Sequence, residues 1–219
     1  FTELTPDNLV GYTTWCYTDG SQTVTLKISD AVSVQSAIVG TPGNDTLTGD
    51  GNPNLVIGLS GDDTIDGGAG ADVLRAEAGN DVLLYDAADL LIDGGSGNDT
   101  LLVDNESTLN LTLIDNAVIS SISTIDLIAA SQNVVFTANA DDILALNEGN
   151  PVSILGGSGD TVALKGNWAM ETTAGGFTPF TLTNSDGVVV TVSIANAIPV
   201  TITYTGADTS VRDEMISGA

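Results

Sequence analysis

The stretch from Gly40 to Leu102 reads GTPGNDTLT, GDGNPNLVI, GLSGDDTID, GGAGADVLR, AEAGNDVLL, YDAADLLID and GGSGNDTLL when it is divided into steps of nine residues. The seven nonapeptides follow one another without insertion or deletion. Their eighth position is always aliphatic, and the residues there are Leu47, Val56, Ile65, Leu74, Leu83, Ile92 and Leu101. Their sixth position holds, in order, Asp45, Asn54, Asp63, Asp72, Asp81, Leu90 and Asp99. A period this regular predicts a solenoid of repeated structural units.

Each nonapeptide divides into a turn and a short strand. The first six residues are rich in Gly, Asp and Asn, which favour turns because they tolerate positive φ angles and form local hydrogen bonds. The last three residues have a central aliphatic side chain and predict a very short strand whose middle residue points inward. One unit cannot bury that side chain alone, whereas stacked units bury a continuous aliphatic column. The repeat therefore predicts an all-β solenoid.

The segments GTPGND, GLSGDD, GGAGAD, AEAGND and GGSGND resemble the repeats of RTX (hemolysin-type) proteins, a family of secreted bacterial calcium-binding proteins. The resemblance covers Gly40 to Leu102, somewhat under a third of the chain. It implies a parallel β-roll in which two nonapeptides complete one turn of the solenoid. It also implies calcium ions between successive turns, held by the sixth-position aspartates and by backbone carbonyls of units n and n+2.

The implied geometry sorts the sixth positions onto two edges of the roll. One edge would hold three inter-turn calcium sites, formed by Asp45, Asp63, Asp81 and Asp99 with the glycines Gly43, Gly61, Gly79 and Gly97. On the other edge, Asn54 and Asp72 would form at most a weak site. Leu90 cannot bind a cation, so the position beside Asp72 should be empty unless Asp89 turns inward. The hypothesis is a one-sided ladder, with three ions on one edge and none or one on the other.

Two nonapeptides depart from the pattern, and both fall on that second edge. YDAADLLID has Tyr85, Ala87 and Ala88 in place of turn glycines, and GDGNPNLVI contains Pro53. We interpret these changes as drift on an edge that neighbouring chain covers, in preference to a specific ligand site around Tyr85.

The acidity of the chain supports a bound cation. The 219 residues include 29 Asp+Glu against 4 Lys+Arg, a formal net charge of −25. Twelve of the acids lie between Gly40 and Leu102, where Arg75 is the one basic residue. Aspartates in turns stacked ~5 Å apart would repel one another without a counter-ion, which disfavours a metal-free solenoid. Carboxylate and carbonyl oxygens suit Ca²⁺, and its binding is expected to contribute to the free energy of folding.

The composition also excludes several classes of function. With no histidine there is no Ser/His/Asp or Cys/His catalytic centre, and Cys16 alone makes neither a disulfide within the chain nor a zinc site. The few basic residues, Lys27, Arg75, Lys165 and Arg212, are too scattered to neutralise nucleic acid or an anionic membrane. Apolar runs never exceed four residues, so insertion into a membrane is not expected.

The repeat divides the chain into three predicted segments. Residues 1–39 should form a β-hairpin or cap, with strands over Val10–Tyr17 and Val24–Ile28. Residues 40–102 form the roll, and residues 103–219 an irregular continuation with a β-rich C-terminal cap. The sequence following Asn139 predicts one short helix, because Asn139 is a good N-cap and acidic residues occupy the first turn.

Four short segments of the C-terminal part are similar to modules that follow RTX repeats in large bacterial surface adhesins. They are Ile125–Leu127, Ala140–Leu144, Gly159–Val162 and Gly166–Trp168. The segment GGSGDTVAL, which starts at Gly156, echoes the nonapeptide but has Thr161 where Asp would belong. We interpret it as a turn and not as a calcium site.

These observations favour a non-enzymatic, calcium-binding extracellular module of a surface adhesin, S-layer or matrix filament. The resemblance implies export by type I secretion, with folding on calcium outside the cell. Self-assembly into a filament or lattice, and a carbohydrate or cell-surface partner, are further expectations. The alternative is the non-catalytic part of a secreted RTX lipase, protease or epimerase. Ice binding is disfavoured, because the third position of the repeat carries no row of threonines.

Overall fold

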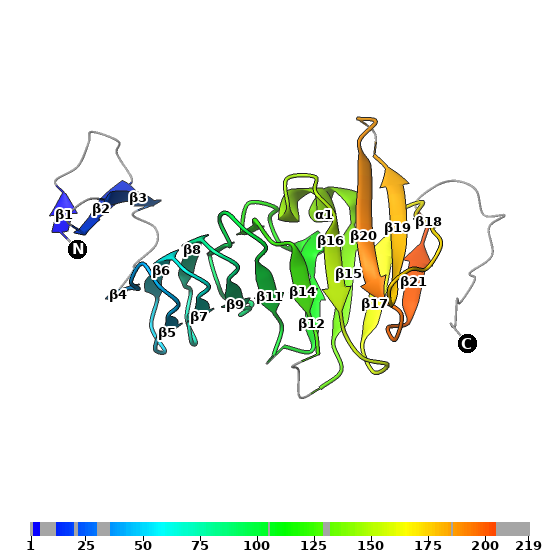
Figure 1. Ribbon diagram of the computed structural model, residues 1–219, viewed down its shortest axis with the longest axis horizontal. Helices are drawn as coiled ribbons and strands as arrows, with labels where there is room; N and C mark the ends of the chain where they lie inside the picture. The colour runs from blue at the N-terminus through cyan, green and yellow to red at the C-terminus, as the bar shows by residue number, and fades with distance from the viewer. Residues whose placement is uncertain are drawn as a thin grey trace.

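The computed structural model describes residues 2–4, 12–19, 22–29, 36–104, 106–128, 132–184 and 186–204. Over these residues the chain consists mainly of short strands that pair in parallel (Figure 1). The described part contains a single α-helix, α1 (Ala140–Leu146). The predicted all-β parallel roll with one short helix is confirmed.

Two sheets form the walls of the roll. The first contains, in spatial order, β13 (Ile119–Ser120), β10 (Leu91–Asp93), β8 (Val73–Ala78), β6 (Asn54–Ser60) and β4 (Ser36–Val39). The parallel part of the second runs through β20 (Val189–Ala195), β16 (Val152–Leu155), β14 (Thr124–Asp126), β11 (Thr100–Leu102), β9 (Val82–Leu84), β7 (Thr64–Asp66) and β5 (Thr46–Thr48). The chain alternates between these walls, and Figure 1 shows the successive coils of the roll side by side.

The strand register confirms two nonapeptides per turn. Leu47 is paired with Ile65 on the next coil, and Ile65 with Leu83, each 18 residues further along the chain. Because every eighth-position side chain points inward, the two walls share one apolar interior. Its fully buried eighth-position members are Val56, Ile65, Leu74, Leu83, Ile92 and Leu101.

Beyond Leu102 the coils lengthen while the aliphatic column continues. Leu101 is paired with Ile125, Ile125 with Ile154, and Ile154 with Ile194. The added length builds a third wall of parallel strands, which are β12 (Thr108–Asn110), β15 (Val135–Asn139), β17 (Thr161–Lys165) and β21 (Val200–Thr203).

An antiparallel hairpin closes the far end of the second wall. The strand β19 (Phe177–Thr183) pairs antiparallel with β20, and β18 (Ala169–Met170) pairs with β19. The amide of Gly187 donates to the carbonyl of Asn184 at 3.1 Å in the connection from β19 to β20. The C-terminal segment is therefore a widened solenoid that ends in a β-hairpin.

The helix α1 begins where the sequence predicts. The Asn139 side chain accepts hydrogen bonds from the amides of Asp141 and Asp142, and the Asp142 carboxylate accepts one from the Asn139 amide. This reciprocal capping box satisfies the free amides of the first turn. The amide of Ile122 donates to the carbonyl of Leu146 at 2.7 Å, which ties the helix to the coil after β13.

The chain departs from a strand pattern directly after β12. Leu109, Leu111 and Leu113 alternate with polar residues, as is typical of a strand, but β12 ends at Asn110 and Leu111–Leu113 form a 3-10 turn. The Asn110 side chain accepts a hydrogen bond from the Thr112 amide at 3.2 Å and caps this turn. A local side-chain cap thus outweighs the alternating pattern.

The N-terminal segment contains the predicted hairpin. The strands β2 (Tyr12–Asp19) and β3 (Gln22–Ser29) pair antiparallel, and β1 (Thr2–Leu4) pairs with β2. The residues of the predicted turn, Gly20 and Ser21, lie outside the described residues. The proposed role of this segment as a cap stays a prediction.

Candidate metal centre

The turns of the nonapeptides lie on two opposite edges of the roll. On the first edge they lead from the first wall to the second, and they comprise residues 40–45, 58–63, 76–81 and 94–99. On the second edge they lead back to the first wall, and they comprise residues 49–54, 67–72 and 85–90. All sixth-position residues of one edge therefore follow one another along the stack.

Three aspartates form a hydrogen-bonded ladder on the first edge. Each uses one carboxylate oxygen, Oδ1, to accept from the backbone amide of the sixth residue one coil earlier. Asp63 accepts from the Asp45 amide at 2.8 Å, Asp81 from the Asp63 amide at 2.7 Å, and Asp99 from the Asp81 amide at 2.9 Å. The structure thus brings the predicted first-edge residues together in a single row.

The other carboxylate oxygen of each ladder aspartate has no hydrogen-bond partner. Asp63, Asp81 and Asp99 are each only 1 % exposed, and their Oδ2 atoms are buried and unpaired. A buried polar atom without a partner costs about 1–3 kcal/mol, and an unpaired charge costs more. Three such atoms in a row on one edge are therefore a site for a positively charged ligand.

Burial changes the acidity of these carboxyl groups. Loss of solvation is the main cause that raises the pKa of Asp63, Asp81 and Asp99, and for Asp99 it raises the pKa to about 6. Hydrogen bonds from the preceding coil oppose the shift, while neighbouring carboxylates add to it. A bound cation would oppose the shift and lower these pKa values, because it stabilises the charged form.

Backbone carbonyls converge on the same places. A Cβ atom added to Gly40 would lie 2.5 Å from the Gly58 carbonyl oxygen and 2.8 Å from Asp45 Oδ2. At Gly58 the added atom would clash with Asp63 Oδ2 and lie 2.7 Å from the Ala76 carbonyl oxygen. A carboxylate and a carbonyl thus line one cradle, and this donor set suits Ca²⁺, which takes six to eight oxygen ligands.

Asp45 differs from the other members of the row. Its Oδ2 accepts from the Thr41 amide at 2.6 Å and from the Thr41 hydroxyl at 2.9 Å, so this oxygen is already paired. Asp45 is also the first member of the ladder, where the stack ends. Its part in the first inter-turn site stays a prediction.

The fourth-position glycines let the turns approach one another closely. Gly61, Gly79 and Gly97 have φ angles of 120°, 152° and 140°, and a Cβ atom on each would clash with the backbone of the corresponding glycine one coil earlier. The carbonyls of Gly43, Gly61 and Gly79 therefore face the next coil. Their predicted role as calcium ligands stays a prediction, whereas their steric role is direct.

A second ladder on the first edge was not predicted from the sequence. In the first three turns the fifth-position side chain accepts from the fifth-position amide of the next coil. Asn44 accepts from the Asp62 amide at 2.9 Å, Asp62 from the Asn80 amide at 2.8 Å, and Asn80 from the Asn98 amide at 3.0 Å. The signal for it was the Asn or Asp at the fifth position of all four first-edge units, Asn44, Asp62, Asn80 and Asn98.

The second edge continues the same pattern as far as Asp72. The Asn54 amide donates to Asp72 Oδ1 at 2.7 Å, and Asp72 Oδ2 is buried and unpaired. The side-chain oxygen of Asn54, Oδ1, accepts from the Asp50 backbone amide at 2.9 Å. The side-chain nitrogen of Asn54, Nδ2, donates to the Ser36 hydroxyl at 3.0 Å. Asn54 is therefore satisfied within the protein, and Asp72 provides the free oxygen of this pair.

A carboxylate occupies the position beside Asp72, because Asp89 turns inward where Leu90 could not bind a cation. Leu90 is 41 % exposed and points away from the stack, while Asp89, one residue earlier, takes the inward place. The Asp72 amide donates to Asp89 Oδ1 at 3.2 Å, and Asp89 Oδ2 is buried and unpaired. Loss of solvation is the main cause that raises the pKa of Asp89 to about 8, and the Asp72 carboxylate adds to the shift.

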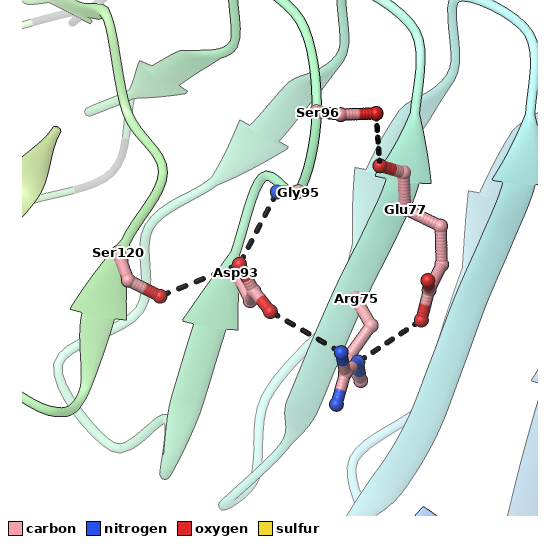
Figure 2. A network of polar contacts seen from close by, with 6 residues as sticks. All are labelled: Arg75, Glu77, Asp93, Gly95, Ser96 and Ser120. Carbon is pink, nitrogen blue, oxygen red and sulfur yellow. Dashed lines mark hydrogen bonds and ion pairs between the residues drawn. The ribbon is translucent and has the colours of Figure 1, made fainter. Parts of the chain in front are cut away.

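The basic residue of the roll belongs to a separate surface network (Figure 2). The Arg75 Nε lies 3.1 Å from Glu77 Oε1, and its Nη2 lies 3.4 Å from Asp93 Oδ2. Asp93 Oδ1 also accepts from the Gly95 amide at 3.2 Å and from the Ser120 hydroxyl at 3.3 Å. Arg75 therefore compensates carboxylates of the first wall and leaves the ladder oxygens without a cation from the protein.

No cluster of three or more Asp, Glu, His or Cys side chains that could hold a metal occurs among the described residues. A site in this roll therefore needs backbone carbonyls beside its carboxylates. The unpaired oxygens and the glycine cradles fit that requirement.

The comparison with protein families agrees with this geometry. The chain matches the RTX calcium-binding nonapeptide repeat in 4 copies, over residues 37–52, 49–83 and 91–105. RTX nonapeptide repeats bind calcium ions, so the roll is an RTX calcium-binding β-roll and its cofactor is Ca²⁺. Repeats of this class are typical of proteins that leave the cell by type I secretion.

No curated protein matches the chain. Within the part of the chain that the structure describes, no helix has the length and apolar character needed to cross a membrane.

Proposed function

We propose that this protein is a non-enzymatic, extracellular structural module of a surface adhesin, S-layer or matrix filament, and that calcium folds its roll after type I secretion. The observation that carries the proposal is the row of buried carboxylate oxygens without hydrogen-bond partners on successive coils. Such a row is unfavourable without a cation and favourable with one. Calcium binding is therefore coupled to formation of the stacked coils.

The coupling suits a protein that crosses a membrane unfolded. Extracellular calcium modules bind the ion with dissociation constants of about 10⁻⁴ to 10⁻³ M. The scarce free calcium of a cytosol would leave the acidic repeat unfolded, and millimolar calcium outside would fold it. The charge of −25 strengthens the effect, because repulsion between carboxylates opposes compaction before the ions bind.

A non-enzymatic role is supported by the structural hydrogen bonds that the buried aspartates make. The buried carboxylates of the repeat belong to the ladders between coils, and the chain has no histidine. The buried Asp142 and Asp160 accept hydrogen bonds from backbone amides and hold local turns. These acids have structural partners in the chain itself.

We further propose that the module assembles end to end. The second wall ends at β5 on one side and at β18 on the other, and each pairs with a single strand in the described part of the chain. Neither strand contains a charged residue. Uncharged strand edges of this kind are templates for pairing with another copy.

The calcium-dependent fold is tested by far-ultraviolet circular dichroism. The chain in excess chelator should lose most of its β-sheet signal, and addition of millimolar calcium should restore it. Magnesium at the same concentration controls for ionic strength and should restore little, since it requires smaller, octahedral sites. A spectrum that chelator leaves unchanged would contradict the proposal.

A further inference from the structure

We propose that the second edge of the roll holds a calcium ion at Asp72 and Asp89, in a site that the nonapeptide pattern does not describe. The inference rests on the proposed calcium-dependent folding. It also replaces the interpretation of the YDAADLLID unit as drift. The family match leaves out residues 84–90, between its segments 49–83 and 91–105, so the repeat assigns no ligand to this turn.

The turn at residues 85–90 preserves the ladder by a shift of one residue. The Leu90 side chain is turned outward, and the Leu90 amide donates to the Asp72 carbonyl at 2.8 Å. Asp89 then accepts from the Asp72 amide at 3.2 Å, the same contact that sixth-position aspartates make elsewhere. The fifth residue of this unit therefore occupies the place of a sixth residue.

Two unpaired oxygens result on neighbouring coils of the same edge. Asp72 is fully buried and Asp89 is 8 % exposed, and the Oδ2 atoms of both are buried without a hydrogen-bond partner. A Cβ atom on Gly67 would lie 2.5 Å from Asp72 Oδ2, so the glycine cradle seen on the first edge is present here too.

Another buried aspartate of the chain shows that burial alone does not leave a carboxylate oxygen without a hydrogen-bond partner. Asp160 is also the fifth residue of a repeat-like unit, GGSGDTVAL, and it is 6 % exposed. Its Oδ1 accepts from the Val134 amide at 2.9 Å on the preceding coil, as in the ladders. Its Oδ2, however, accepts from the Gly157 amide at 2.7 Å. Asp160 is therefore satisfied by the protein, whereas Asp89 requires an external partner.

The surroundings of Asp89 can supply further oxygens to an ion. A cavity of about 210 Å³ lies beside it, and its lining includes Tyr85, Asp86 and Asp115. No Lys or Arg lines this cavity. It has room for water molecules, which complete the coordination of calcium in many protein sites. The acidic lining and the unpaired oxygens of Asp72 and Asp89 therefore favour a cation as the ligand.

The first test counts calcium ions on the full chain by equilibrium dialysis. The variant D89N keeps the acceptor for the Asp72 amide and removes the charge, so it should bind one ion fewer than the unaltered protein. The variant D160N is the matched control and should bind the unaltered number. If D89N binds as many ions as the unaltered protein, the second-edge site is wrong, although calcium-dependent folding stands. If the unaltered protein binds no calcium, the proposed function itself fails.

A second test does not depend on the stability of D89N. Terbium replaces calcium in oxygen sites, and a nearby tyrosine sensitises its luminescence. Tyr85 lines the cavity beside Asp89, so Y85F should reduce tyrosine-sensitised terbium emission while the number of bound ions stays the same. Y204F, at an exposed tyrosine in the last strand region, is the control and should leave the emission unchanged. Equal emission from Y85F and the unaltered protein would overturn the assignment.

Discussion

Each aspartate of the first-edge ladder beyond Asp45 divides its two carboxylate oxygens between two tasks. One oxygen accepts an amide of the preceding coil and sets the distance between coils, while the other is left for a cation. Asparagine lacks the second carboxylate oxygen, and Asn54 illustrates this, because its one side-chain oxygen accepts from the Asp50 amide within its own turn. The sixth position of the repeat therefore selects aspartate for its charge and for its second acceptor together.

Substitution of a central ladder aspartate should weaken calcium-dependent folding more than substitution at the end of the ladder. Asp81 lies between two coils and has an unpaired oxygen, whereas the oxygens of Asp45 include one that Thr41 satisfies. We expect D81N to raise the calcium concentration at half-folding about tenfold or more, which corresponds to about 1.4 kcal/mol. D45N should change it less. A calcium titration followed by circular dichroism measures both, and equal shifts would contradict the division of tasks.

The raised pKa values predict an unusual pH dependence of the calcium-free protein. The pKa of Asp99 is about 6 and that of Asp89 about 8 in the folded state, against about 3.9 for an unfolded aspartate. Between about pH 4 and pH 8 these two carboxyl groups hold more protons in the folded state than in the unfolded state. The free energy of unfolding therefore falls as the pH rises through this interval. Protons thus substitute in part for calcium.

Far-ultraviolet circular dichroism in chelator at pH 5 and pH 8 tests this expectation. The calcium-free protein should keep more of its β-sheet signal at pH 5 than at pH 8. In saturating calcium the difference should shrink or reverse, because protons then compete with the ions. A larger β-sheet signal at pH 8 than at pH 5 in chelator would show that the ladder carboxylates are not desolvated.

At the scale of a single turn, the spacing between coils depends on the fourth-position glycine. Gly79 has a φ angle of 152°, and a Cβ atom there would clash with the Gly61 carbonyl. We expect G79A to abolish stacking of the adjacent coils and to cost several kcal/mol, of the order seen for strained backbone and overpacking. G51A is the matched control, since a Cβ atom at Gly51 meets nothing within 4 Å. Thermal unfolding in calcium compares them, and equal losses would contradict the steric argument.

The periodic elements could be predicted from the sequence, while the exceptions depended on local hydrogen bonds. The eighth-position aliphatics and sixth-position acids specify strand, turn and register, because both repeat every nine residues. The inward turn of Asp89 does not follow from that period, since it depends on competition between Leu90 and Asp89 for one place in the stack. The 3-10 turn at Leu111 likewise depends on the side chain of Asn110. Sequence periodicity reports the shared environment of repeated positions, and it does not report a shift within one unit.

For the whole molecule, the acidity has two physical roles. Twelve of the 29 acidic residues lie in the repeat, where some face inward as ladder members and others, such as Asp50 and Asp62, are exposed. The inward acids make the fold depend on calcium, and the exposed acids keep the chain soluble before and after folding. Calcium bound along the edges also lowers the net negative charge and so weakens repulsion between copies. Assembly should therefore depend on calcium in two ways, through the fold and through the charge.

End-to-end assembly through β5 can be tested by light scattering at increasing protein concentration. In millimolar calcium the mean mass should rise with concentration, and in chelator it should stay that of a single chain. T48K places a charge on the exposed edge strand and should reduce the rise, because a lysine on an edge strand opposes pairing with another strand. S158K, on an exposed turn away from β5, adds the same charge and should leave the rise unchanged. Equal reduction by both variants would assign the effect to net charge, and a constant single-chain mass in calcium would contradict assembly.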